Sequence, residues 1–139
     1  MKTLLSIFLI TIAFNTLSQS QRSFRVDTLS VYFELNSSRL SDSMLMEIIA
    51  LRKRIGDSSI VELKAFCDTT ATIHYNKQLA QRRIDEVILK GQINGSNVKQ
   101  RVLGEEFDFS RMNYTAEQFR RVDIIYKKPN RLFSEYEGL

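Results

Sequence analysis

Apolar and polar residues alternate over four short stretches of the chain, at residues 29–35, 60–66, 98–103 and 121–126. In the first stretch, Leu29, Val31, Phe33 and Leu35 are separated by polar residues or tyrosine. This period of two is typical of a β-strand that buries one face. The pattern therefore predicts four strands.

Two other stretches repeat their apolar residues at helical spacing. The first begins after Ser41, a suitable N-cap, and ends before Gly56, with basic residues in its last turn. The second covers residues 75–90 and is expected to end at Gly91. The apolar stripes that predict these helices consist of Leu45, Ile48, Ile49 and Ile55 in the first, and Leu79, Ile84, Val87 and Ile88 in the second.

The order of these elements predicts an α/β (α+β) two-layer domain of βαβαββ order, with a mixed sheet and two main helices on one face. The first strand, helix and second strand form a βαβ unit, which implies that the two strands pair in parallel through a right-handed crossover. The last two strands lack a long helix between them and need not be parallel. Asp68 follows the second strand, at the carboxyl edge where open α/β sheets bind ligands.

The first 20 residues have the order of a secretory signal peptide. Lys2 precedes an apolar run at residues 4–17, and small residues at Ser18 and Ser20 follow it. The run is shorter than the roughly 20 residues that span a bilayer, so we expect cleavage after Ser20. The alternative is an uncleaved anchor, the one case in which membrane contact is expected. The remaining segments are 21–28, a linker or lead-in strand, 29–127, the domain, and 128–139, a C-terminal tail.

Composition indicates an ordinary folded domain, with 43% hydrophobic and 26% charged residues. The net charge of +4, which falls by one if Lys2 is removed, is too small to indicate a polyanionic partner. Cys67 is the only cysteine, so no intramolecular disulfide can form. One histidine and one cysteine do not make a zinc site. We therefore predict no metal and no cofactor.

The stretch at residues 65–87 carries the candidate chemistry. Asp68 lies in a polar turn, and Arg83 lies on the helix that follows. Asn76, Ala80 and Arg83 share a helix face that is distinct from the apolar one. We therefore expect Arg83 to point outward over the turn of Asp68, where its guanidinium can make paired contacts to a carboxylate. An acid beside a base suits a ligand that carries both charges.

Five separated blocks resemble the OmpA C-terminal-like (OmpA/MotB/Pal-type) peptidoglycan-binding domain. The resemblance covers residues 29–126 and depends on the order and spacing of all five blocks. The blocks are the strand that ends in Asp68, the pair Tyr75-Asn76, the helix positions Leu79, Arg83 and Val87, the pair Gly104-Glu105, and Arg120-Arg121-Val122-Asp123-Ile124.

The resemblance implies non-catalytic binding of peptidoglycan through the diaminopimelate end of its stem peptide. In the family, an aspartate holds the ammonium and an arginine the carboxylate, and Asp68 and Arg83 match these positions. Asn76 matches a supporting polar contact, and Thr69 completes the predicted ligand-binding set. The implied location is the periplasm, at the outer membrane or cell wall. The chain departs from the family pattern at Ala65, Phe66, Cys67, Ala71 and Phe119.

The alternative function is a degenerate domain that acts as a structural or protein-interaction module of the envelope. Exposed aromatic residues in the loop after Gly104 would favour it. An enzyme is not predicted, because Cys67, Asp68 and His74 all lie in one short turn. A nucleic-acid partner is not expected either, because the basic pairs are scattered and the export signal removes that partner.

Overall fold

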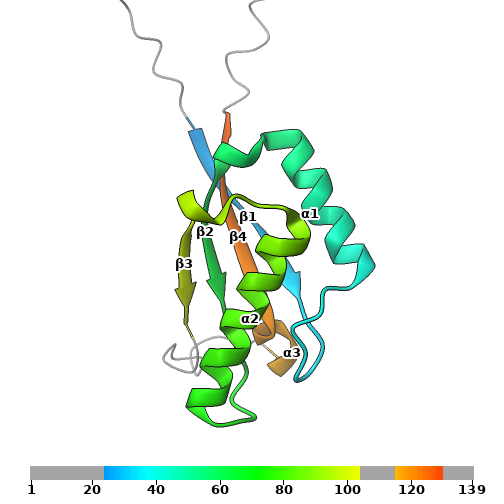
Figure 1. Cartoon of the computed structure of the whole chain (residues 1–139), viewed down its shortest axis with the longest axis vertical. Helices are drawn as coiled ribbons and strands as arrows, with labels where there is room; N and C mark the ends of the chain where they lie inside the picture. Colours follow the sequence, from blue (N-terminus) through cyan, green and yellow to red (C-terminus); the bar gives the residue numbers. More distant parts are fainter. Residues whose placement is uncertain (1–23, 104–114, 130–139) are drawn as a thin grey trace, which may run out of the picture.

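The computed structural model describes residues 24–103 and 115–129 of the 139-residue chain. Four strands form one mixed sheet in the order β1-β4-β2-β3, and two long helices pack on it (Figure 1). This confirms the predicted fold class. The elements in chain order are β1 (Phe24–Tyr32), α1 (Asp42–Ile55), the 3₁₀ turn η1 (Asp57–Ser59), β2 (Ile60–Ala65), α2 (Ile73–Gly91), the 3₁₀ turn η2 (Gly95–Asn97), β3 (Lys99–Val102), α3 (Ala116–Phe119) and β4 (Arg121–Pro129).

The prediction that the first two strands pair with each other is wrong, because β4 lies between them. β4 is antiparallel to both β1 and β2, and the parallel pair is β2 with β3, which α2 connects. The crossover rule fixes the relative direction of β1 and β2, which do run the same way, but it does not make them neighbours. The central place suits β4 because Val122 and Ile124 are fully buried and Tyr126 nearly so.

Both helices lie on the same face of the sheet. The chain crosses from β1 to β2 through α1 and from β2 to β3 through α2, in one direction across the sheet. Two crossovers of the same hand and direction place their helices on one side, as Figure 1 shows. The core fills the space between the layers, and its fully buried members include Val31, Ile48, Leu63, Ile84, Val87 and Ile124. Each such side chain contributes about 1.5–3 kcal/mol by leaving water.

β1 begins five residues earlier than predicted and ends three residues earlier. Nine consecutive residues pair with β4, from Phe24 opposite Pro129 to Tyr32 opposite Arg121. Strand pairing depends on main-chain hydrogen bonds and does not require apolar side chains. β1 therefore extends beyond the alternating apolar run and includes residues 24–28 of the predicted linker or lead-in. Leu35, predicted to be buried, is 58% exposed. The predicted leader (1–20), most of the loop after Gly104 and most of the tail lie outside the described residues.

The ends of α1 are as predicted. Ser41 is the N-cap, and its side-chain oxygen accepts a hydrogen bond from the Met44 N–H at 3.3 Å. At the other end, the Gly56 N–H donates to the Arg52 carbonyl at 2.8 Å. Gly56 has φ 75° and ψ 157°, a region that is essentially accessible to glycine alone. The glycine therefore sets both the end of the helix and the direction of the chain toward β2.

The ends of α2 differ from the prediction. The helix starts at Ile73, after the N-cap Thr72, and Gly91 is its last residue and not its cap. Gln92 follows in the left-handed conformation at φ 52°. Gly91 is needed for close packing, because a Cβ atom there would lie 2.8 Å from Cγ2 of the buried Ile48 on α1.

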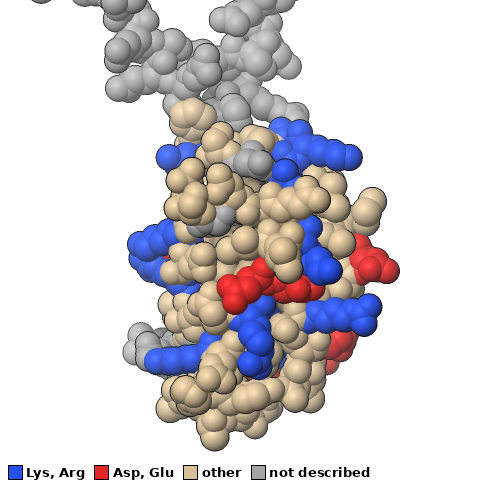
Figure 2. All heavy atoms as spheres, viewed as in Figure 1, with Lys and Arg blue, Asp and Glu red and all other residues tan. Residues whose placement is uncertain are grey.

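Charge is unevenly distributed over the domain. On the helix-covered face in Figure 2, the end where β1 begins and β4 ends shows Lys and Arg side chains, and no Asp or Glu side chain among the described residues. In the described part of the chain, no helix has both the length and the apolar character needed to cross a membrane.

Replacing Gly56 with alanine should lower the free energy of unfolding by about 1–3 kcal/mol, because the added Cβ is strained at this φ and ψ. The measurement is urea unfolding. Gly56→Asn is the informative second variant, since asparagine relieves strain in the left-handed helical region but not at a ψ of 157°. A fully stable Gly56→Asn protein would contradict this explanation.

Candidate functional site

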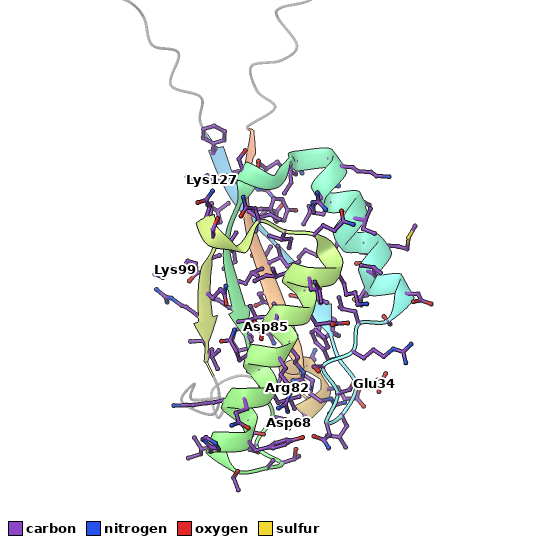
Figure 3. All side chains as sticks on the ribbon, viewed as in Figure 1. Glu34, Asp68, Arg82, Asp85, Lys99 and Lys127 are labelled. Atoms are coloured by element: carbon purple, nitrogen blue, oxygen red, sulfur yellow. The ribbon has the colours of Figure 1, made fainter. Side chains whose placement is uncertain are left out.

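Asp68 lies at the end of the sheet where β2 ends, on the turn that leads into α2 (Figure 3). Asp68 is 8% exposed, and two neighbours hold its carboxylate. The Thr70 hydroxyl donates to Oδ1 at 2.6 Å, and Nη1 of Arg120 lies 3.3 Å from Oδ2. The predicted position of Asp68 at the carboxyl edge of a parallel strand is thus as expected, but its charged partner is not.

Arg120 belongs to one of the five blocks of the resemblance, but it was not among the predicted ligand-binding residues. It lies between α3 and β4, and 13% of its side chain is exposed. Its Nε donates to the Phe33 carbonyl at 3.4 Å, and Nη2 lies 3.9 Å from a carboxylate oxygen of the exposed Glu117. The missing information was the strand order: once β4 is known to be antiparallel to β2, the start of β4 must meet the end of β2.

The prediction that Arg83 points outward is wrong, because its side chain is buried. It is 1% exposed, and on the same helix face Asn76 is 2% and Ala80 0% exposed. The face that looked polar in the sequence therefore packs against the sheet. Amphipathic spacing failed here because the helix buries two of its polar side chains together with its apolar ones.

The guanidinium of Arg83 donates hydrogen bonds to three main-chain carbonyls. Nε donates to the Ser37 carbonyl at 2.9 Å, Nη2 to Glu34 at 3.3 Å and Nη1 to Phe66 at 3.3 Å. A guanidinium offers five donors in a fixed fork, and these three carbonyls come from two different segments. Burial lowers the pKa of this guanidinium, and within the described residues no ion pair joins it to Asp68.

Asn76 holds the turn that carries Asp68. Its Nδ2 donates to the Asp68 carbonyl at 3.0 Å and to the Ala71 carbonyl at 3.2 Å. The Cys67 thiol donates to the main-chain carbonyl of Asn76 at 3.1 Å and lies 3.6 Å from Nη1 of Arg83. Burial raises the pKa of this thiol. The buried side chains of Asn76 and Cys67 thus fix the turn through hydrogen bonds on its inner side.

Asp68 and Asn76 line an open hollow of about 680 Å³. Arg120 lines a second hollow of about 580 Å³, so the two members of the ion pair line different hollows. Of the four predicted ligand-binding residues, Arg83 lines neither hollow, and Thr69 is exposed beside them. The other residues around the first hollow are Leu35, Asn36, Thr70, Ala71, Thr72, Tyr75 and Leu79.

Most departures from the family pattern lie outside both hollows. Ala65 and Phe119 are buried, and the buried Phe66 ring packs under the Arg121 guanidinium at 4.3 Å. Of the five departures, only Ala71 lines the first hollow. The described residues contain no group of three or more His, Cys, Asp or Glu side chains that could hold a metal ion.

The chain has the fold of OmpA-like domains. It is similar to the OmpA-like domain of FopA1 from Francisella tularensis, with a TM-score of 0.62 and 17% identity over 75% of this chain and 73% of that one. It is also similar to the peptidoglycan-associated lipoprotein from Burkholderia pseudomallei, with a TM-score of 0.52 and 20% identity over 71% of this chain and 89% of that one. For the cell wall anchor of the T6SS from Pseudomonas aeruginosa, the TM-score is 0.52 and the identity is 19%, over 76% of this chain and 87% of that one. No protein-family model and no curated protein matches the sequence.

Arg83→Met should lower the free energy of unfolding by about 3 kcal/mol, because it removes one buried and two partly buried hydrogen bonds from a charged donor. Arg82→Met is the matched control, since Arg82 is exposed and should change stability by no more than about 0.5 kcal/mol. Chemical denaturation of both variants decides the matter. Equal stabilities would mean that Arg83 does not support the fold.

The raised pKa of the Cys67 thiol predicts a loss of stability at alkaline pH. The contribution is complete below the ordinary thiol pKa of about 8.5 and falls as the pH rises above it, because the unfolded chain loses this proton first. The slope from one such group approaches about 1.4 kcal/mol per pH unit. Denaturation between pH 7 and 10 should show it in the wild type and not in Cys67→Ala. An identical slope in both proteins would refute the assignment.

Proposed function

We propose that this chain is a non-catalytic domain that binds peptidoglycan through the diaminopimelate end of the stem peptide, in the bacterial envelope. The observation that carries the proposal is the mostly buried Asp68 carboxylate, which borders an open hollow and is paired with a partly exposed arginine. A buried charge that faces a hollow is costly unless it serves binding or is paired. Asp68 is paired with Arg120, and its place beside the hollow supports a role in binding.

The amino-acid end of diaminopimelate carries an ammonium and a carboxylate, and the site offers one group for each. Asp68 takes the ammonium. Arg120, 3.3 Å away, takes the carboxylate, the role that the resemblance gives to Arg83. Binding exchanges the internal ion pair for two new ones, so the loss of the Asp68–Arg120 contact is compensated. Leu35 and Leu79 provide an apolar wall for the aliphatic part of the ligand.

The remaining predicted residues support this site from its margin. Asn76 keeps the turn of Asp68 in place through its two hydrogen bonds to main-chain carbonyls. Thr69 is exposed next to Asp68 and is available for a polar contact. Arg83 acts from beneath, since it holds the main chain at Glu34 and Ser37, next to Leu35 and Asn36 in the wall of the hollow.

The names of two structural relatives agree with this proposal, since one is a peptidoglycan-associated lipoprotein and another a cell wall anchor. With the secretory order of residues 1–20, they favour a periplasmic location at the outer membrane or cell wall. One observation favours the alternative of a protein-interaction module of the envelope: Asp68, Arg120 and Arg83 all have partners within the chain.

Co-sedimentation with purified peptidoglycan tests the proposal. Asp68→Asn keeps the shape of the side chain but removes its charge, and should weaken binding at least about tenfold, since a hydrogen bond to a charged group contributes about 1.5–3 kcal/mol. Asp85→Asn is the control, because Asp85 is an exposed aspartate on α2 whose loss changes the net charge equally. Urea unfolding of both variants separates loss of binding from loss of fold.

Two results would count against the proposal. If the wild type stays in the supernatant, the interaction-module function replaces it. If Asp68→Asn still sediments with the wall like Asp85→Asn, any binding occurs elsewhere on the chain. Arg120→Gln, measured in the same way, then tests whether the carboxylate of the ligand is held at the second hollow.

A further inference from the structure

The end of the domain opposite Asp68 gathers basic side chains from three elements. There β1 begins and β4 ends, with Arg25 opposite Lys128 and Val26 opposite Lys127. α1 ends at the same place (Figure 1), with Lys53 and Arg54 in its last turn. We call these five cations, Arg25, Lys53, Arg54, Lys127 and Lys128, the basic end.

Few acidic groups balance the basic end. Arg25 lies 3.9 Å from Asp27, and its side chain is 71% exposed. Within the described part of the chain, the other four cations have no ion-pair partner. In the view of Figure 2, this end shows blue side chains and, among the side chains that are described, no red ones.

The α1 cations alone would have an ordinary explanation. Lys and Arg in the last turn of a helix stabilise its dipole, and Arg52 of the same turn donates to the Gly91 carbonyl at 2.7 Å. The strand residues Arg25, Lys127 and Lys128 have no such role. Their arrival at the same end from two other elements indicates an anionic partner.

Exposed apolar side chains accompany these cations. Phe24 is 54% and Val26 62% exposed, and both lie on the sheet face that the helices leave open. Val26 is directly opposite Lys127 on that face. Cations beside an exposed aromatic and an exposed aliphatic residue fit the surface of an anionic bilayer, where headgroups attract the cations and the interface accepts the apolar groups.

The chain outside the described residues also points to a bilayer as the occupant. In the sequence, the apolar run at residues 4–17 ends seven residues before Phe24, so during export, or as a retained anchor, it would bring the basic end to the bilayer first. Asp68 and Lys127 lie at opposite ends of the domain (Figure 3). A domain that rests on lipid through the basic end therefore presents its hollows away from the membrane.

We propose that the basic end docks on the headgroups of anionic phospholipids and orients the site of Asp68 away from the bilayer. The partner is the lipid surface itself, and each exposed cation near an anionic surface strengthens binding by roughly fivefold. The docking is salt-dependent, because charges at an exposed surface are screened within about 10 Å at 0.1 M salt. It does not depend on the ligand proposed for Asp68.

The test is flotation of the full chain with vesicles of phosphatidylcholine alone and of phosphatidylcholine with phosphatidylglycerol. The wild type should prefer the anionic vesicles, and the preference should fall as salt rises. Lys53→Gln/Lys127→Gln should weaken this preference about 25-fold. The control is Arg39→Gln/Arg82→Gln, which removes two exposed cations that lie elsewhere on the domain and should leave the preference intact. Residues 1–23 are the same in every variant, so their contribution cancels.

Three results would overturn the proposal. Equal binding to the two kinds of vesicle would show that no anionic lipid is recognised. An equal loss in both double variants would show that net charge acts and not the basic end. If Lys53→Gln/Lys127→Gln instead weakens sedimentation with peptidoglycan, the basic end contacts the wall. A failure of the lipid-docking proposal can be told from a failure of the proposed function, because Asp68→Asn tests the latter at the other end of the domain.

Discussion

The buried guanidinium of Arg83 is the interaction on which the rest of this domain depends. From one position on α2 it holds the main chain after β1, at Glu34 and Ser37, and the main chain after β2, at Phe66. These segments have irregular backbone, so their carbonyls have no ladder to join. A single planar group with donors on two sides satisfies them together, which an apolar side chain of the same size could not do.

The site of Asp68 is built on this anchor. The turn at residues 66–71 is held by Arg83 on one side and by Asn76 on the other, so its carboxylate has a fixed position at the sheet edge. The segment after β1, held by the same guanidinium, supplies Leu35 and Asn36 to the wall of the hollow. Arg120 then reaches Asp68 from the start of β4. Support of the turn and the ion pair with Asp68 are thus divided between two arginines.

The sequence predicted the elements of this fold better than their arrangement. Local signals were sufficient for α1, whose cap Ser41 and terminal Gly56 act within one turn of the helix. The neighbour of β1 was out of reach, because pairing with β4 is decided by contacts far apart in the chain. The same lack of long-range information misplaced Arg83, whose acceptors lie 17 to 49 residues away, and hid Arg120, 52 residues from Asp68.

The position of β4 has a consequence for how the chain reaches its fold. β4, the last strand of the described chain, occupies a central place in the sheet, and its pairing with β1 joins residues as far apart as Phe24 and Pro129, 129 − 24 = 105 positions from each other. Until residue 121 and its successors are available, β1 has no partner and the apolar faces of α1 and β2 have no complete layer to cover. Contacts of such separation form late, since the ordering of the intervening chain precedes their gain. During synthesis, β1 and the apolar faces of α1 and β2 therefore stay uncovered until β4 has been made.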